Sequence, residues 1–359
     1  MKHIVSIVGA RPQFIKAAAL SPLLRKKFRE TIIHTGQHYD DRMSAAFFRD
    51  LHIPSPTYNL GVGSGPHGAQ TGQMLGKLEP LLERLRPDIA LVYGDTNSTL
   101  AGALVAAKLH IPLAHVEAGL RSYNRQMPEE INRIVSDQLA TLLFCPTEQS
   151  VHNLHREGRE KGIHLVGDIM KDLLLQNMSV AKKTSDVVQR LSLQPKEYYL
   201  CTIHRAENTQ SSGQIVDILL ALTHLDKEVV IPLHPRSRAL LTRSATKRLA
   251  RYPRLKIVKP LGYLDMLHLE MSAYKILTDS GGVQKEAYIL KVPCITLRNE
   301  TEWVETLRGK WNQLSGRSMQ RIVRATHATP RQQDYRPAMY GRGDASVRIT
   351  RILHEYCTA

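Results

Sequence analysis

The sequence predicts an α/β protein with two Rossmann-like, doubly wound parallel-sheet domains that face each other across a cleft. Short runs of apolar and β-branched residues alternate with longer helical patterns through nearly the whole chain. This alternation restarts near residue 198, after a polar segment at 179–196 that is rich in Lys, Ser and Gln. Strands that alternate with helices form parallel sheets covered on both faces, so two such series predict two domains.

The first series begins with a strand, and its first helix at 12–24 opens on Pro12, a residue favoured in the first helical turn. Another helix is predicted at 98–109. The predicted strands of this series are at 3–8, 31–34, 89–93, 112–116, 142–145 and 164–166. We therefore expect a first domain at residues 1–172.

The second series predicts a domain at residues 173–343, with the boundary in the region 170–190. Its predicted strands are at 199–203, 229–233, 256–258, 275–278 and 293–297. A last helix, within residues 344–359, is expected to cross back to the first domain. Ligands of parallel sheets bind beyond the carboxyl ends of the strands, so residues just after strands are the ones to examine.

The composition, with 42% hydrophobic and 23% charged residues, is that of a soluble globular protein. The first apolar run, at 4–8, is too short for a signal peptide or a membrane span, so we expect a cytoplasmic protein with no membrane partner. The four cysteines are far apart and form no CxxC pair, which argues against zinc or disulfides. Walker, GxGxxG and HExxH patterns are absent, so neither a cofactor nor a metal is expected.

The formal net charge is +16, and a basic stretch contributes to it: Arg236, Arg238, Arg243, Lys247, Arg248, Arg251 and Arg254. A nucleic-acid surface is one interpretation. Few aromatic residues are interleaved with these cations, and no zinc-finger or RRM-like signature is present. Solvated helix faces and attraction of anionic substrates are therefore favoured, with no nucleic-acid partner.

In the first half, polar residues follow three predicted strands. Arg11, after Gly9-Ala10, could bind a phosphate or carboxylate at a helix N-terminus, or lie in solvent beside a tight turn. Asp95 could be a catalytic acid or only a helix N-cap. Glu117 ends a strand that should be buried, which is uncommon for an unpaired carboxylate. Glu129 and Glu130 begin a helix, where the dipole alone would favour them.

In the second half, His204 and Arg205 follow a strand and could bind phosphate, although a loop histidine can serve as a cap only. The run from Asp279 to Glu286 joins a strand to a helix, and its two glycines leave the opening amides accessible to a diphosphate. Glu286 could accept hydrogen bonds from ribose hydroxyls. His234 and Arg236 could be site or surface residues, and the sequence does not decide between these.

Taken in order, these segments resemble the non-hydrolysing UDP-N-acetylglucosamine 2-epimerases. The motifs run through nearly the whole chain: GARPQFIK from Gly9, GDTNST from Gly94, HVEAGLR from His115, PEEINR from Pro128, HRAEN from His204, DSGGVQKE from Asp279 and YGRGDASVRI from Tyr340. The resemblance implies a GT-B-like fold, a homodimer and a role in surface polysaccharide synthesis. It also implies anti elimination of UDP to a 2-acetamidoglucal, followed by re-addition with the opposite configuration at C2.

The resemblance also implies roles for single residues. The implied catalytic residues are Asp95, Glu117, Glu129 and His204. The implied substrate-binding residues are Arg11, Lys16, Arg205, Tyr263, Ser280, Gly281, Gly282 and Glu286. The partners that follow from these roles are a UDP-sugar and UDP, held in a cleft that we expect to close while UDP waits between the half-reactions.

Three positions depart from the commonest family pattern, which reads GTRPE, QEE and TERPE. This chain has Ala10 with Gln13 at the first, Lys285 at the second and Trp303-Val304 at the third. These variants resemble the branch that acts on UDP-2,3-diacetamido-2,3-dideoxy-glucuronic acid, so both this sugar and UDP-GlcNAc are candidate substrates. The hydrolysing epimerases differ more at the first loop.

Two other function classes remain as alternatives. A retaining GT-B glycosyltransferase would share the fold and nucleotide site but needs no proton-shuttling acids. A catalytically inactive UDP-sugar sensor need not keep Asp95, Glu117 and Glu129, and all three are present.

Overall fold

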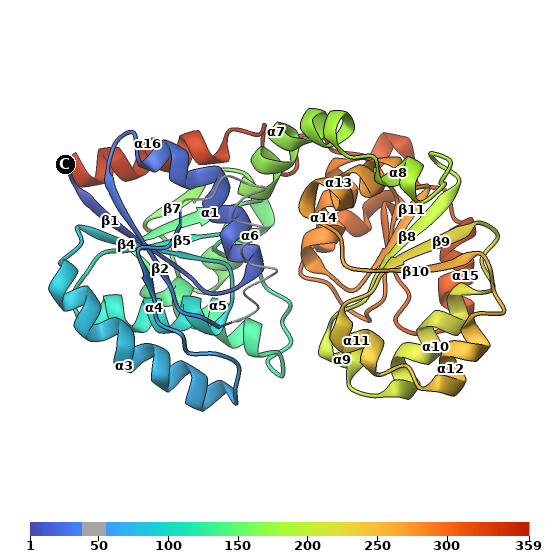
Figure 1. Cartoon of the computed structure of the whole chain (residues 1–359). Coiled ribbons are helices and arrows are strands. Elements are labelled where there is room, and N and C mark those ends of the chain that lie inside the picture. The colour runs from blue at the N-terminus through green and yellow to red at the C-terminus, as the bar shows by residue number, and fades with distance from the viewer. Residues whose placement is uncertain (38–54, 359) are drawn as a thin grey trace. The chain divides into compact units, whose positions relative to one another are not determined.

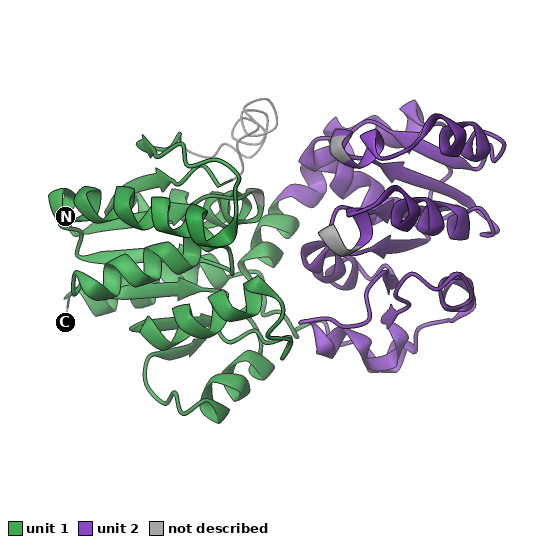
Figure 2. Ribbon diagram, turned by 90° about the horizontal axis from the view of Figure 1, so that it is seen from below, with its two compact units in different colours: residues 1–176, 338–359 green, residues 177–337 purple. Residues whose placement is uncertain are grey.

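The computed structural model describes residues 1–37 and 55–358, apart from the side chains of Arg11, Ala206, Glu207 and Arg236. The chain forms two compact units (Figures 1 and 2). Unit 1 contains Met1–Gln176 and Ala338–Ala359, and unit 2 contains Asn177–Pro337. Among the described helices, none has the length and apolar character that crossing a membrane requires.

Unit 1 is built on a seven-stranded sheet with the order β3-β2-β1-β4-β5-β6-β7, and all its described strand pairs are parallel. The order reverses between β1 and β4, which is where open parallel sheets bind ligands. The strands are β1 (His3–Val8), β2 (Arg29–His34), β3 (Tyr58–Asn59), β4 (Ile89–Tyr93), β5 (Leu113–Val116), β6 (Leu142–Cys145) and β7 (Ile163–Leu165).

The helices of unit 1 cover both faces of this sheet (Figure 1). They are α1 (Arg11–Leu24), α3 (His67–Leu85), α4 (Asn97–Lys108), α5 (Pro128–Leu139), α6 (Glu148–Arg156), α16 (Ala345–Thr358) and α7 (Ile169–Thr184), the last of which continues into unit 2. All residues of β1 and β4 are buried, as expected for strands covered on both faces. On α4, a Cβ at Gly102 would lie 2.9 Å from Ile7 and from Val92, so glycine allows this helix to approach the sheet closely.

Unit 2 has a six-stranded parallel sheet with the order β10-β9-β8-β11-β12-β13. Its order reverses between β8 and β11. The strands are β8 (Tyr198–Thr202), β9 (Glu228–Pro232), β10 (Leu255–Val258), β11 (Lys275–Thr278), β12 (Cys294–Thr296) and β13 (Asn312–Leu314). The helices are α8 (Val187–Arg190), α9 (Ala206–Thr209), α10 (Ser212–Leu222), α11 (Pro235–Ala239), α12 (Arg243–Leu249), α13 (Tyr263–Ser272), α14 (Gly281–Ile289) and α15 (Met319–His327), with 3₁₀ turns η1 (Val304–Lys310) and η2 (Gln332–Asp334).

The predicted fold class, two doubly wound parallel-sheet domains, is confirmed by these two sheets. The edge strands β3 and β13 were not predicted; they are two and three residues long and include Asn59, Asn312 and Gln313. The polar segment at 179–196 is largely helical, since it contains the end of α7 and all of α8. Ala181 and Val187 are fully buried there, although the segment shows no clear helical period.

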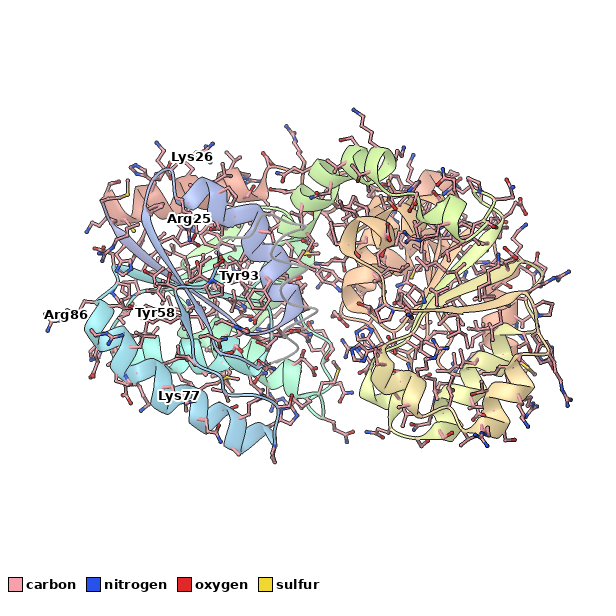
Figure 3. All side chains as sticks on the ribbon, viewed as in Figure 1. Arg25, Lys26, Tyr58, Lys77, Arg86 and Tyr93 are labelled. Atoms are coloured by element: carbon pink, nitrogen blue, oxygen red, sulfur yellow. The ribbon has the colours of Figure 1, made fainter. Side chains whose placement is uncertain are left out.

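Basic side chains lie mainly at the surface. Figure 3 labels Lys26, Lys77 and Arg86 at the periphery of unit 1, whereas Tyr93 lies inside it. The first three are exposed and Tyr93 is fully buried. In unit 2, Arg243, Lys247 and other cations of the basic stretch are likewise exposed. The net positive charge is thus largely solvated.

The returning helix α16 is attached to unit 1 by a buried carboxylate. Asp172 accepts hydrogen bonds from the amides of Ala345 (3.2 Å) and Ser346 (2.7 Å) and from the Ser346 hydroxyl (2.7 Å). These amides belong to the first turn of α16, which has no intrahelical acceptor for them. Just before this turn, a Cβ on Gly341 would lie 2.8 Å from the Cα of Gly167, so both backbones need glycine.

We predict that Asp172→Ala lowers the free energy of unfolding of unit 1 by about 1–3 kcal/mol, because it leaves buried donors without an acceptor. Urea unfolding would measure this loss, and hydrogen exchange should show faster exchange in α16. The control is Asp186→Ala, whose exposed ion pair with Arg190 should contribute less than about 0.5 kcal/mol. Equal effects of the two substitutions would contradict the capping role of Asp172.

Candidate active site

The loop after β1 is bound to the loop after β4 by one buried amide. Gln13 Oε1 accepts from the amides of Gly9 (2.7 Å) and Ala10 (3.0 Å). Its Nε2 donates to the Tyr93 carbonyl (2.7 Å) and lies 2.9 Å from the Thr99 hydroxyl. A carboxylate at this position could not donate to the Tyr93 carbonyl, so this hydrogen bond explains why a neutral amide, Gln13, is found here. The side chain of Arg11, which the sequence places at this loop, lies outside the described residues.

Glu117 follows β5 directly and forms a buried ion pair with Lys16 of α1. Both side chains are about 8% exposed. The backbone of Glu117 has a φ of +74°, an uncommon value for a residue with a side chain, and such conformations concentrate at functional sites. The amides of Glu117 and Ala118 both donate to the Phe144 carbonyl at 3.1 Å, which stabilises this turn.

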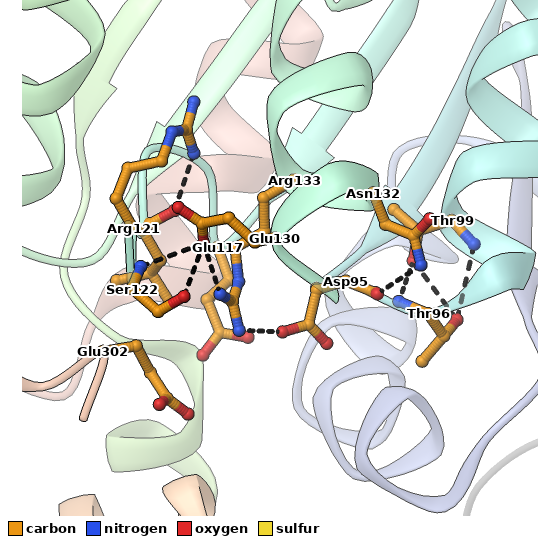
Figure 4. A network of polar contacts seen from close by, with 12 residues as sticks. Asp95, Thr96, Thr99, Glu117, Arg121, Ser122, Glu130, Asn132, Arg133 and Glu302 are labelled. Carbon is orange, nitrogen blue, oxygen red and sulfur yellow. Dashed lines mark hydrogen bonds and ion pairs between the residues drawn. The ribbon is translucent and has the colours of Figure 1, made fainter. Parts of the chain in front are cut away.

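Asp95 follows β4, the strand next to β5, and is bound by residues of α5. Arg133 Nη2 lies 2.5 Å from Asp95 Oδ2, and Asn132 Nδ2 donates to the Asp95 carbonyl at 2.9 Å. Figure 4 shows Arg133 between the carboxylates of Asp95 and Glu130. Arg133 Nη1 lies 2.8 Å from Glu130 Oε2. Glu129, in the first turn of the same helix, is half-buried.

Glu130 is more than a first-turn acid that complements the helix dipole. It is 1% exposed and accepts hydrogen bonds from the amides of Ser122 and Tyr123, each at 2.9 Å. It therefore shapes the loop that leads into α5 and holds Arg133 toward Asp95. We call Asp95, Glu117 and Glu130, with their partners Lys16 and Arg133, the acid cluster of unit 1.

In unit 2, a buried carboxylate shapes the loop after β8. Asp279, at the end of β11, is fully buried and accepts hydrogen bonds from the amides of His204 (3.1 Å) and Arg205 (3.0 Å) and from Asn208 (3.0 Å). Burial opposes its ionisation, but these donors and the His204 ring, 3.2 Å away, hold the pKa of Asp279 below its ordinary value. The His204 ring itself is 56% exposed and thus open to a ligand.

The start of α14 carries the two glycines that the sequence analysis selected. The Ser280 hydroxyl accepts from the Val283 amide as the N-cap. A Cβ at Gly281 would lie 2.3 Å from Glu302 Oε1, so this glycine is required by a neighbouring carboxylate. Glu302 pairs with Arg298 (2.9 Å) and Arg205 (3.7 Å).

Other selected residues surround this helix in unit 2. Glu286 lies one turn further along α14 and is 8% exposed. Tyr263 is buried at the first position of α13. The Nζ atom of Lys285 lies 4.1 Å from the centre of the Trp303 ring, a cation–π contact between two of the three departures from the common pattern.

The selected residues therefore fall into two groups, one in each unit. Unit 1 brings together Lys16, Asp95 and Glu117, with Glu129 on the helix that binds Asp95. Unit 2 contains His204, Arg205, Tyr263, Ser280, Gly281, Gly282 and Glu286. The roles of Arg133, Asp279 and Glu302 were not predicted. Arg133 and Asp279 lie in motifs that contain a selected residue, and Glu302 directly precedes Trp303, one of the departures from the common pattern.

Together, the paired sheets and strand-end residues define a GT-B-like α/β enzyme with acids in one domain and an anion-binding type of helix N-terminus in the other. The model of the family described as UDP-N-acetylglucosamine 2-epimerase matches residues 23–354, and the chain belongs to this family. It is thus an isomerase of this type.

Relatives match the chain over nearly its full length. It is 50% identical over 353 residues to a UDP-N-acetylglucosamine 2-epimerase homolog of Methanococcus maripaludis, with 98% of this chain and 99% of that protein covered. It is 44% identical to the UDP-2,3-diacetamido-2,3-dideoxy-D-glucuronate 2-epimerase of Pseudomonas aeruginosa, with 98% and 99% covered. The crystal structure of the Methanocaldococcus jannaschii UDP-GlcNAc 2-epimerase with UDP-GlcNAc and UDP matches with a TM-score of 0.91 and 43% identity, and 99% and 100% of the two chains are covered.

We predict that Asp279→Asn destabilises unit 2 by about 1–3 kcal/mol at neutral pH. The pKa of Asp279 is lower in the folded than in the unfolded chain, so its contribution is present above the unfolded value of about 3.9 and is lost as the pH falls through the folded value. The difference between variant and wild type should therefore shrink in acid. Urea unfolding at several pH values measures this, with the exposed Asp217→Asn of α10 as control. If the difference in unfolding free energy between Asp279→Asn and wild type does not change with pH, the ionised carboxylate of Asp279 does not stabilise unit 2.

Proposed function

We propose that the enzyme interconverts UDP-GlcNAc and UDP-ManNAc by inverting the sugar at C2. The C1–O bond to UDP breaks, the C2 proton passes to a carboxylate, and a 2-acetamidoglucal with a C1–C2 double bond forms. UDP then adds back at C1 while a proton is delivered to C2 from the opposite face. The observation that carries this proposal is the pair of acids, Asp95 and Glu117, at the ends of adjacent strands, each with its own cation.

The chemistry requires acids of this kind. A C2–H beside an intact acetal is not acidic, so departure of UDP must develop positive charge at C1 before the proton leaves. Carboxylates near C1 and C2 stabilise this charge and move the proton on either face. We assign these roles to Asp95, Glu117 and Glu129. Their partners support the assignment, because Lys16 and Arg133 place a positive charge beside Glu117 and Asp95, respectively.

Unit 2 is assigned to the nucleotide. The N-terminus of α14, with Ser280, Gly281 and Gly282, suits a diphosphate, and a Cβ at Gly282 would lie 3.8 Å from the Ser280 hydroxyl, an ordinary contact. Glu286 is assigned to the ribose hydroxyls. The exposed ring of His204, with Arg205 and Arg11, is assigned to the diphosphate as it leaves and waits. Lys16 and Tyr263 complete the substrate-binding set.

The cellular setting is inferred from the cysteines and from the family resemblance. The four cysteines are all free, which supports a reducing compartment such as the cytoplasm. The homodimer and the supply of surface polysaccharide synthesis rest on the family resemblance alone.

A second candidate substrate is UDP-2,3-diacetamido-2,3-dideoxy-glucuronic acid, which would give the mannuronic form by the same reaction. Two observations favour it: Lys285 lies over Trp303 where the common pattern has acidic and basic residues, and the Pseudomonas aeruginosa relative is named for this sugar. An additional positive charge suits a substrate that carries a carboxylate.

We predict that the purified protein incorporates deuterium at C2 in D2O when no acceptor is present, and that a manno-configured UDP-sugar appears. Proton NMR with UDP-GlcNAc and, separately, with the diacetamido-glucuronic sugar would measure both events and identify the substrate. Turnover of the second sugar only would replace the first proposal. If neither sugar exchanges its C2 proton, the epimerase proposal is wrong, and a glycosyltransferase becomes the function to test.

Two matched substitutions separate chemistry from binding. Glu117→Gln should abolish epimerisation, because an amide cannot accept the proton, whereas UDP affinity should remain within a few-fold of wild type. Glu286→Ala should mainly weaken UDP binding, by about 1–3 kcal/mol for a lost hydrogen bond to a charged group. Calorimetric titration with UDP and the NMR assay measure these outcomes. Loss of UDP binding in Glu117→Gln, or unchanged affinity in Glu286→Ala, would remove that residue from its assigned role.

A further inference from the structure

His115 is on the strand that leads to Glu117 and has no exposed surface. It is on β5, two residues before Glu117. Its Nδ1 is 2.7 Å from Asp137 Oδ1, and its Nε2 is 2.7 Å from the Gly94 carbonyl oxygen. Gly94 directly precedes Asp95. One buried ring thus precedes Glu117 by two residues in the sequence and contacts the residue directly before Asp95.

Both partners of His115 are acceptors. A peptide carbonyl has no hydrogen to donate, so Nε2 must carry one. Asp137 is fully buried, and its other oxygen accepts from Arg121 (2.7 Å) and from the Gly119 amide (3.0 Å). Burial opposes the ionisation of Asp137, but the guanidinium of Arg121, which is always charged, favours it whatever the charge on His115, so this group is a carboxylate. Nδ1 must therefore carry a hydrogen as well, and the ring is an imidazolium.

The charges around this imidazolium are balanced within the network. Asp137 faces His115 and Arg121, and Arg121 also pairs with Glu157 at 2.6 Å. Two cations and two carboxylates alternate, which is how buried charges are accommodated. The network is thus complete without a ligand.

The network contacts the turns that carry both acids. The His115 ring binds the carbonyl of Gly94, whose φ of +61° begins the turn to Asp95. Asp137 binds the amide of Gly119, two residues after Glu117, and a Cβ at Gly119 would lie 2.3 Å from the Ser150 carbonyl. The imidazolium and its carboxylate therefore hold two turns whose separation sets the distance between Asp95 and Glu117.

We propose that His115 is a positioning residue of the epimerase reaction, which as a doubly protonated ring fixes the peptide before Asp95 and, through Asp137, the turn after Glu117. This inference rests on the proposed function of Asp95 and Glu117. It assigns His115 no contact with the substrate.

Two substitutions separate the contacts of the ring. The amide nitrogen of Asn is placed like Nδ1 of histidine, so His115→Asn keeps the donor to Asp137 and loses the one to Gly94. The amide nitrogen of Gln is placed like Nε2, so His115→Gln keeps the donor to Gly94. In this variant Asp137 also keeps its contacts with the Gly119 amide and Arg121, so both turns stay bound. We expect kcat of His115→Asn to fall on the order of 10- to 100-fold below that of His115→Gln, with KM of the UDP-sugar within about threefold, because misplaced acids slow chemistry more than binding.

The assay uses the sugar that the wild-type enzyme turns over, with rates normalised to the folded fraction from near-UV circular dichroism. Equal kcat values in the two variants would overturn the positioning role, and so would a change confined to KM. A purely structural role would lower stability in both variants without separating their kcat values.

A second measurement does not depend on activity. In wild-type protein with ¹⁵N-labelled histidine, long-range ¹H–¹⁵N spectra should show one buried ring with both nitrogens protonated at neutral pH, and either variant that folds identifies its signal. Sixteen histidines make this assignable. If every histidine is a neutral tautomer, the inference fails even if epimerisation is confirmed. If the protonated ring is found but no sugar reacts, the proposed function fails and the network stands.

Discussion

The pairing of each carboxylate with a cation at the carboxyl edge of the unit 1 sheet is the constraint on which the rest of that unit depends. Parallel strands end at the same edge, so Asp95 and Glu117, which follow the adjacent strands β4 and β5, are brought together by topology. Two negative charges at one edge of a sheet repel each other. Lys16 from α1 and Arg133 from α5 offset this repulsion, so these two helices are held at the edge as well.

Unit 2 uses buried carboxylates for a different purpose. Asp279 accepts hydrogen bonds from two backbone amides of the loop after β8 and from one side-chain amide. Its carboxylate therefore fixes the backbone conformation that presents His204. Glu302 is matched by Arg298 and Arg205. The acids of unit 1 follow their strands as candidates for proton transfer, whereas these acids of unit 2 serve the loops. The same residue type at the same edge of a similar sheet thus has two roles, and its hydrogen-bond partners distinguish them.

The fold was predictable because buried parallel strands are continuous apolar runs, as in β1 and β4. The edge strands β3 and β13 were not, since two or three residues with amide side chains carry no such signal. The candidate acids were predictable from their position after strands. The hydrogen-bond partners within the site were not predictable, because they are distant in the sequence: Gln13 and Tyr93 are 80 residues apart, and Arg205 and Asp279 are 74 residues apart. Single-sequence patterns extend over one element, whereas these contacts depend on which strands become neighbours.

The contacts of Gln13, Lys285 and Trp303 show what the three departures from the common family pattern do in this fold. Gln13 is explained by its donor to the Tyr93 carbonyl, so its neutrality need not report on the substrate. Lys285 and Trp303 touch, so positions that carry Glu and Arg in the common pattern are neighbours in this fold. An ion pair and a cation–π contact are both attractive, and the exchange therefore preserves contact between α14 and the segment before η1. It does not preserve charge: the Glu–Arg pair is neutral, and the Lys–Trp pair carries one positive charge. That charge is on α14, the helix assigned to the nucleotide, and Lys285 is only 2% exposed.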